Sequence, residues 1–299
     1  MNPPDSPHPP ADFDELVKRL KQGFPSMTPQ FQVGARYLLD FSAEVPIASM
    51  RMIARQAGVQ PATLVRLAQS MGFEGWAAMK DVFVQAFRQT PRMYANQARK
   101  VVRSRSRNAM VGQALAAQAA NLGMIEGRNA RGLARAVDLL SSASRVHVAG
   151  FRACFPPAFT LHYLYRLFRP SVTLLRGDAG TLEMELRAVT PDDAIVVMSF
   201  APYSQETLRI ADAARKIGCK VLAISDSVVA PMAQHADCTL IVSTETPSFF
   251  PSVTSFVALV ELLVEQLLAR EGMQAVSGIE LAEAQLHESG AYVLPKQAG

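Results

Sequence analysis

The spacing of apolar residues along the chain changes about halfway through. From Phe13 to Arg88 they recur at helical intervals, without strand-like alternation, and Pro or Gly repeatedly interrupts the pattern. Thr28 followed by Pro29 suits a helix start, and Gly58 suits a helix end. The predicted helices cover about 28–42, 47–57, 60–72 and 76–88. Such short helices with short breaks indicate a small helical bundle.

After a further helical stretch, about 112–141, short β-rich runs alternate with helical patterns. These runs are apolar throughout, which is typical of parallel strands buried on both faces. The predicted strands are 145–149, 172–175, 194–199, 220–225 and 239–242, and the later helices are 204–217, 252–270 and 277–286. The sequence therefore predicts an α + α/β chain, in which an all-helical domain precedes a three-layer αβα domain with a five-stranded parallel sheet.

These patterns divide the chain into four expected segments. They are a helical domain over 13–90, a basic linker and connecting helix over 91–127, an α/β domain over 128–270 and a tail over 271–299. A length of 299 residues suits two domains, and a hydrophobic content of 49% is enough for sizeable cores.

Charge separates the two halves further. The net charge is +4, yet residues 1–112 carry 15 basic and 8 acidic residues while residues 113–299 carry 15 and 18. The run 92–107 is basic and contains no acid, so it is either a solvated linker or an arm that contacts phosphate. A basic half beside an acidic half indicates two tasks, the basic one directed at a polyanion.

Several classes of protein are disfavoured. Three Cys without C-x-x-C spacing indicate a reducing, cytosolic compartment, so we expect a cytoplasmic protein. The longest apolar stretch, 255–269, is interrupted by Glu261 and Glu265, so no membrane helix is expected, and the Pro-rich start does not fit a signal peptide. Without the usual metal-ligand spacings or glycine-rich nucleotide motifs, we expect no metal and no cofactor.

A helix-turn-helix fits the residues around Gly58. Two helices that cross steeply need a small residue where they pass closely, here Ala54, and a residue that tolerates the left-handed conformation at the corner, here Gly58. Val59, Leu64 and Leu67 would then pin the second helix onto the first.

With those residues facing inward, polar side chains remain on the outer face. Gln suits adenine, Arg suits guanine, and Thr suits a phosphate or a thymine methyl group. The predicted DNA-contacting residues are Arg51, Arg55, Gln60, Ala62, Thr63, Arg66, Gln69 and Lys80. A plain helical hairpin is the alternative, and Arg66 could equally form a surface salt bridge. Phe73 and Trp76 suit the core better than base stacking.

The stretch M-R-M-I-A-R-Q-A-G-V-Q-P-A-T-L-V-R-L-A-Q-S-M-G-F-E-G-W-A-A-M-K, residues 50–80, resembles the N-terminal domain of RpiR-type bacterial transcriptional regulators. Its ending, from Gly72 to Lys80, has the G-F-x-G-aromatic pattern of that family, followed by its Lys. The family usually has Ser where Gln60 stands, so the helix N-cap or its phosphate contact is expected to differ. The resemblance implies a double-stranded DNA operator as partner and a C-terminal sugar isomerase (SIS) domain.

In the α/β half, hydroxyl residues gather where the third predicted strand meets its helix. Ser199 ends the strand, and Tyr203, Ser204 and Thr207 lie in the following loop and first helical turn. Hydroxyls and free N–H groups at a helix start can cradle a phosphate or a carboxylate. The alternative is that Ser204 is only an N-cap and Ser199 a satisfied strand-end hydroxyl.

Residues 128–270 resemble a SIS domain through V-H-V-A-G-F-R-A-C, I-V-V-M-S-F-A-P-Y-S-Q-E-T and V-L-A-I-S-D-S-V-V-A-P-M-A-Q-H-A-D. The resemblance implies a sugar-phosphate clamp, and thus a phosphosugar or sugar acid as a small anionic effector. The first loop departs from the family, because Arg152 replaces the usual hydroxyls; it could hold an anion or pair with Asp178 or another acid. The predicted effector-binding residues are Gly150, Arg152, Ser199, Tyr203, Ser204, Thr207 and Ser252, of which Ser252 could be merely structural.

An isomerase would need an acid and a base over the substrate. The candidates Glu206, Glu245, His147, His162 and His235 form no recognisable pair, and His147 suits a buried strand, so we predict no catalytic residue. The favoured function is a DNA-binding regulator that senses an anionic metabolite and acts as a homodimer or homotetramer, because one helix-turn-helix reads one half-site. The alternatives are a sugar-phosphate isomerase with a helical oligomerisation domain, and a helical domain that docks a protein.

Overall fold

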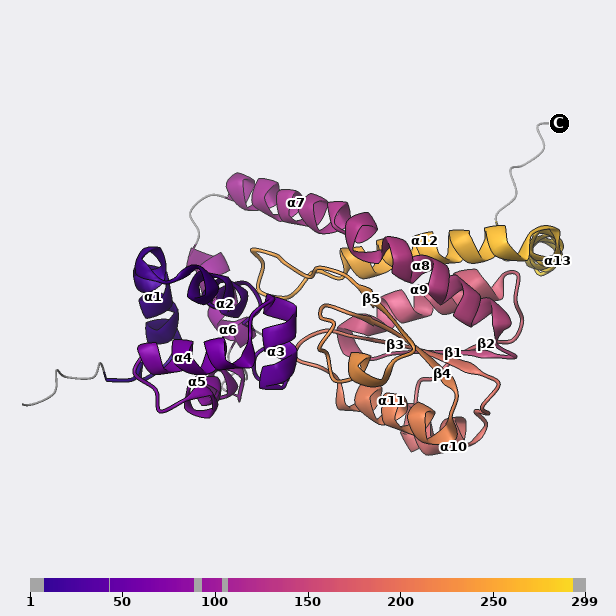
Figure 1. Ribbon diagram of the computed structural model, residues 1–299. Coiled ribbons are helices and arrows are strands. Elements are labelled where there is room, and N and C mark those ends of the chain that lie inside the picture. Colours follow the sequence, from indigo (N-terminus) through magenta and orange to yellow (C-terminus); the bar gives the residue numbers. More distant parts are fainter. Residues whose placement is uncertain (1–7, 43, 89–92, 104–106, 293–299) are drawn as a thin grey trace, which may run out of the picture. The chain divides into compact units, whose positions relative to one another are not determined.

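The computed structural model describes residues 8–42, 44–88, 93–103 and 107–292 (Figure 1). The chain forms two compact units. The first is built on Met1–Arg105 together with Ser248–Phe250, and the second on Ser106–Pro247 together with Pro251–Gly299.

The described part of the first unit is helical. Its elements are α1 (Phe13–Gly23), the short 3₁₀ turn η1 (Phe24–Ser26), α2 (Pro29–Asp40), α3 (Met50–Ala57), α4 (Pro61–Ser70), α5 (Trp76–Arg88) and α6 (Met93–Arg103). Asp12, Thr28 and Ser49 cap α1, α2 and α3 through their side-chain oxygens. The predicted helices 28–42, 47–57, 60–72 and 76–88 correspond to α2 through α5. Helix α1 was not assigned from the sequence, and α6 lies in the basic run that was expected to be a linker or an arm.

The core of this unit is built from the apolar faces of α1 to α5. Leu64 and Leu67 of α4 are fully buried and lie over Gly34 of α2, where an added Cβ would stand 3.5 Å from each. Phe73 and Trp76 are both 8% exposed, so the prediction that they belong to the core is confirmed.

The second unit is a three-layer αβα domain with a parallel sheet. Its elements are α7 (Arg107–Gly123), α8 (Ile125–Ser142), β1 (Val146–Gly150), the 3₁₀ turn η3 (Arg152–Cys154), α9 (Phe155–Arg166), β2 (Val172–Leu174), the 3₁₀ turn η4 (Asp178–Gly180), α10 (Leu182–Arg187), β3 (Ala194–Ser199), α11 (Gln205–Ile217), β4 (Lys220–Ser225), the 3₁₀ turn η5 (Ala233–His235), β5 (Cys238–Ile241), α12 (Thr254–Glu271) and α13 (Met273–Glu288). The predicted fold class is confirmed, with β3 and β4 at their predicted bounds. The helical stretch predicted over 112–141 is two helices, because the chain breaks between Gly123 and Ile125.

The five strands run parallel in the order β2-β1-β3-β4-β5. Helices α8, α9 and α12 cover one face of the sheet, and α10 and α11 lie on the other (Figure 1). The chain leaves β1 toward β2 on one side and enters β3 on the other, so the strand order reverses between β1 and β3. Ligands of open α/β sheets bind at the carboxyl ends of the strands beside such a reversal.

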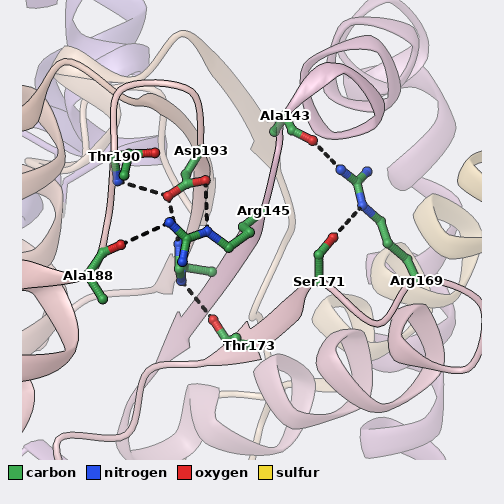
Figure 2. A network of polar contacts seen from close by, with 9 residues as sticks. Ala143, Arg145, Arg169, Ser171, Thr173, Ala188, Thr190 and Asp193 are labelled. Carbon is green, nitrogen blue, oxygen red and sulfur yellow. Dashed lines mark hydrogen bonds and ion pairs between the residues drawn. The ribbon is translucent and has the colours of Figure 1, made fainter.

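The opposite edge of the sheet holds a polar network at the start of β1 and β3 (Figure 2). The buried Asp193 carboxylate accepts hydrogen bonds from the backbone N–H of Thr190, at 2.8 Å, and from the Arg145 guanidinium, at 3.3 Å. Its Oδ2 also lies 3.3 Å from Nε2 of His147, whose Nδ1 lies 2.7 Å from the Thr173 hydroxyl. Because a carboxylate only accepts, Nε2 carries the hydrogen, and Nδ1 accepts from Thr173.

Protonation of His147 would disturb this network. Burial lowers the pKa of His147 despite its bond to Asp193, while hydrogen bonds from Thr190 and His147 outweigh burial and hold the pKa of Asp193 below its usual value. The histidine is 4% exposed and is therefore a core residue, as predicted. Neutral His147 beside ionised Asp193 is the form that the fold favours.

We expect the free energy of unfolding to fall as the pH drops below about 6.5, the pKa of an unperturbed histidine. Unfolded His147 then takes up a proton that the folded residue resists, so its contribution is present above that pH and is lost below it. His147→Gln should reduce this pH dependence in urea unfolding between about pH 7.5 and about pH 5.5. His162→Gln should also reduce the pH dependence, because burial lowers the pKa of His162 in the same direction. An unchanged pH dependence in His147→Gln would contradict this assignment.

Candidate functional sites

The first candidate site is the helix-turn-helix formed by α3 and α4. Gly58 has φ +71° and ends α3, and the Val59 N–H donates to the Ala54 carbonyl at 2.9 Å. Ala54, Val59, Leu64 and Leu67 are buried, as the spacing predicted. The left-handed glycine thus turns the chain so that α4 packs across α3.

The outer face of this motif carries the predicted DNA-contacting residues. Arg51 and Arg55 on α3 are exposed, as are Ala62, Arg66 and Gln69 on α4. The latter three follow helical spacing and share one face, together with the partly exposed Thr63. The structure brings these side chains onto one motif; their contacts with DNA stay a prediction.

Gln60 leaves the start of α4 without a side-chain cap. It occupies the N-cap position but makes no capping hydrogen bond, and Pro61 at the first helical position has no N–H to donate. The side chain of Gln60 is exposed. Gln60, which stands where the family usually has Ser, thus leaves α4 without a side-chain N-cap, as expected.

Lys80 makes a contact inside the helical unit that the sequence did not predict. Its ammonium group donates to the Ala48 carbonyl at 2.7 Å, and the side chain is only partly exposed. Because Ala48 directly precedes Ser49, the cap of α3, this bond ties α5 to the beginning of the helix-turn-helix. Lys80 therefore helps to hold the motif together with one of its three N–H donors, and its contact with DNA stays a prediction.

The second candidate site lies at the carboxyl ends of β1, β3 and β4, beside the reversal of strand order. Ser199 ends β3, and its hydroxyl accepts a hydrogen bond from the Ser204 N–H at 3.1 Å. The Ser204 hydroxyl caps α11 by accepting from the Thr207 N–H at 3.4 Å, and it donates to Oε2 of Glu206 at 2.7 Å. We call Arg152, Ser199 and Ser204 the anion cradle; the Glu206 carboxylate lies against it.

Arg152 reaches the cradle from the loop after β1. Its guanidinium lies 3.5 Å from Oε1 of Glu206, and its backbone has φ +56°, an uncommon conformation for a residue with a side chain. Asp178, the acid named from the sequence as a possible partner, pairs with Arg176 at 2.9 Å, and Glu206 is the other acid that pairs with Arg152. The loops after β1 and β3 therefore meet through Arg152 and Glu206.

Asp226 is a functional candidate that sequence reasoning missed. It follows β4 directly and accepts hydrogen bonds from the Tyr203 hydroxyl and the Ala201 N–H, both at 3.1 Å. Burial raises the pKa of this carboxyl. Burial, together with the nearby carboxylate of Asp226, raises the pKa of the Cys154 thiol to about 12. The sequence signal that could have found Asp226 is its position directly after a predicted buried strand, where ligands of such sheets bind.

Three predicted effector residues have structural roles. An added Cβ at Gly150 would lie 2.4 Å from the Cys154 carbonyl oxygen, so this glycine permits the tight turn η3. Thr207 is fully buried, and its hydroxyl has no hydrogen-bond partner in the described structure, so it does not face the cradle surface as expected. Ser252 is bonded to Thr254 at the start of α12, at 3.1 Å between the two hydroxyls, which fits the structural alternative.

The acid–base candidates do not assemble into a catalytic pair among the described side chains. His147 lies at the opposite edge of the sheet, and the side chain of His235 lies outside the described part. Nδ1 of His162 is buried without a partner among described atoms. Within the described residues, no cluster of three His, Cys, Asp or Glu could hold a metal ion.

Comparison with known proteins identifies the second unit. Residues 139–266 match the SIS domain family. The HTH-type transcriptional regulator YfhH of Escherichia coli, itself called uncharacterized, is 24% identical over 281 residues, which cover 92% of this chain and 97% of that protein. Bifunctional protein glk of Burkholderia mallei is 26% identical over 273 residues, but the chain spans only 42% of its length.

Solved structures support the same fold. The sugar isomerase domain of an RpiR transcription factor from Sphaerobacter thermophilus superposes with a TM-score of 0.56 at 23% identity, over 58% of this chain and 98% of that one. The Vibrio vulnificus NanR protein complexed with ManNAc-6P also gives 0.56, at 18% identity, over 91% of this chain and 98% of that one.

No helix in the described ranges is long and apolar enough to cross a membrane. The resemblance to RpiR-type regulators that the sequence indicated is confirmed: the chain has their architecture, a helix-turn-helix unit followed by a SIS domain.

Proposed function

We propose that the protein is a DNA-binding transcriptional regulator whose SIS domain senses a small anionic metabolite, with a phosphosugar as the leading candidate. The observation that carries the proposal is the pairing, in one chain, of an exposed polar face on α4 with an anion cradle at the reversal point of a SIS sheet. The relatives point the same way, since YfhH is named as a helix-turn-helix regulator and NanR was solved with a phosphosugar.

The DNA-binding part of the proposal assigns double-stranded DNA to the outer face of α3 and α4. Ala62, Arg66 and Gln69 are spaced to reach base edges, while Arg51 and Arg55 can neutralise phosphates. At the start of α4, Pro61 has no N–H and the Thr63 N–H donates to the Gln60 carbonyl at 2.9 Å, so the Ala62 N–H is the first-turn donor that suits a DNA phosphate. Lys80 belongs to this set as well, because its ammonium group gives one of its three N–H donors to the Ala48 carbonyl and keeps its charge.

The sensing part assigns the effector to the anion cradle, where Arg152 and the Ser204 hydroxyl offer charge and a donor to an anion. We propose that this domain senses its ligand without converting it. Proton transfer would need an acid and a base over the same substrate, and His147 lies at the amino end of the sheet while Glu206 lies at the carboxyl end.

We also propose a homo-oligomer that pairs two SIS domains, because one helix-turn-helix reads a single half-site. Helix α7 supports this proposal. Its apolar side chains Val111, Leu115 and Leu122 are 60%, 61% and 38% exposed. No charged residue occurs from Asn108 to Gly123, so a second copy could cover α7 without burying a charge.

The DNA assignment predicts binding that weakens steeply with salt, through release of counterions from phosphates. Labelled DNA from upstream of the gene would be titrated with protein between about 50 and about 200 mM salt. Arg66→Ala should weaken specific binding by about 1–3 kcal/mol if Arg66 contacts a base.

Arg187→Ala is the matched control for Arg66→Ala. It removes an exposed arginine of α10, in the SIS unit, and should leave both the affinity for DNA and its salt dependence unchanged. If wild-type protein binds no DNA in a salt-dependent way, the regulator assignment fails.

The effector assignment predicts that a screen of phosphosugars and sugar acids finds a compound that raises the melting temperature. Arg152→Gln should weaken that compound's binding by about tenfold, the loss expected for one charge-assisted hydrogen bond. Arg176→Gln is the matched control, since it removes an exposed arginine that pairs with Asp178 and leaves the cradle intact. Equal affinities for these two variants would contradict the role of Arg152.

The oligomer assignment predicts that purified protein has at least the mass of a dimer in light scattering. Leu115→Glu should weaken association by about tenfold or more, because it places a charge in an apolar contact. Met184→Glu, at a side chain that is 64% exposed on α10, should have no effect. An unchanged mass for Leu115→Glu would exclude α7 from the interface.

A further inference from the structure

We infer that the Glu206 carboxylate is an internal competitor for the anion cradle, and that an anionic ligand binds there by displacing it. This inference rests on the proposed sensing function and assigns Glu206 a role in selecting the ligand. The sequence placed Glu206 only among possible catalytic acids. In the structure it occupies the groups that an incoming anion would need.

The two oxygens of Glu206 take two different donors of the cradle. Oε2 accepts the Ser204 hydroxyl proton at 2.7 Å, and Oε1 lies 3.5 Å from the Arg152 guanidinium. The Ser204 oxygen in turn accepts from the Thr207 N–H, so its single proton is fully used by Glu206. One carboxylate therefore stands where two oxygens of a phosphate would be held.

Glu206 is an anion in this position. The hydrogen bond from Ser204 is the main reason why its pKa lies below the usual value, and the nearby charge of Arg152 acts in the same direction. Its place in the first turn of α11 also favours negative charge. A second anion cannot join it without repulsion, so a ligand must replace it.

The contacts of Glu206 are weak enough to be exchanged. Its side chain is 36% exposed and that of Arg152 is 74% exposed, and ion pairs that open to solvent contribute little. When Glu206 swings into water it remains hydrated. Displacement therefore costs less than it would for a buried carboxylate.

Asp226, the other carboxylate at this edge, is held differently. It accepts from the Ala201 N–H and from the Tyr203 hydroxyl, so its position is fixed by the loop after β3. Glu206 is thus the carboxylate that can move and Asp226 the one that stays.

This arrangement selects a class of ligand. A compound gains from Ser204 and Arg152 only if it offers them negatively charged oxygens in place of those of Glu206. A phosphate monoester can do so with two oxygens of one group, whereas a neutral sugar offers no charge to Arg152. The cradle should therefore bind phosphate monoesters more tightly than neutral sugars.

The test measures the binding of inorganic phosphate to the full-length protein by calorimetry. Glu206→Gln should bind phosphate about three- to tenfold more tightly than wild type, the range expected when an exposed, charge-assisted contact no longer competes. Glu183→Gln, at an exposed residue in the first turn of α10, makes the same change in net charge and should leave the affinity unchanged. Arg152→Gln should weaken binding, and the response to glucose should be the same in wild type and Glu206→Gln.

A second variant guards against misfolding of the first. Glu206→Asp keeps the charge at the start of α11 but shortens the side chain by one methylene, so it cannot span Ser204 and Arg152 together and should also tighten phosphate binding. If Glu206→Gln and Glu206→Asp, both folded by thermal melting, bind phosphate as weakly as wild type or more weakly, the inference is overturned. Salt-dependent DNA binding and the effector screen would then still decide the proposed function separately.

Discussion

The close approach of the turn η3 to Gly150 is the contact on which the site of the SIS unit depends. A Cβ at this position would stand 2.4 Å from the Cys154 carbonyl oxygen and 2.8 Å from the Ala158 Cβ. Only with a bare backbone there can the chain turn at once from β1 into α9. That turn carries Arg152 toward the loop after β3, and without it the two loops would not share the Glu206 carboxylate.

The two edges of the sheet divide stability from binding. At the amino edge, His147, Thr173 and Asp193 satisfy one another in a buried network, so little polar capacity is left for a ligand (Figure 2). At the carboxyl edge, the bonds of Ser204 and Arg152 are shared with an exposed side chain and can be exchanged. The parallel sheet makes this division possible, because every strand presents its carboxyl end to the same side.

Local sequence signals predicted most of the fold. Continuous apolar runs located all five strands, and the spacing around Gly58 located the helix-turn-helix, because both depend on neighbours along the chain. These local signals do not predict contacts between residues that lie far apart in the sequence. Lys80 reaches Ala48, 32 positions earlier, and Arg152 reaches Glu206, 54 positions later, so neither partner could be read from spacing. Thr207 was expected in the cradle because its helix begins there, yet the rotation of α11 turns it into the core.

Arg152 shows what the binding edge demands of the chain. Its φ of +56° lies in a region that glycine enters freely and that residues with a Cβ enter at a cost of about 1–2 kcal/mol. The side chain that bears this cost is largely in solvent and repays little of it through its exposed pair with Glu206. The residue at this position therefore serves recognition more than folding. A glycine there would relieve the backbone and stabilise the domain, but it would present no cation to a ligand.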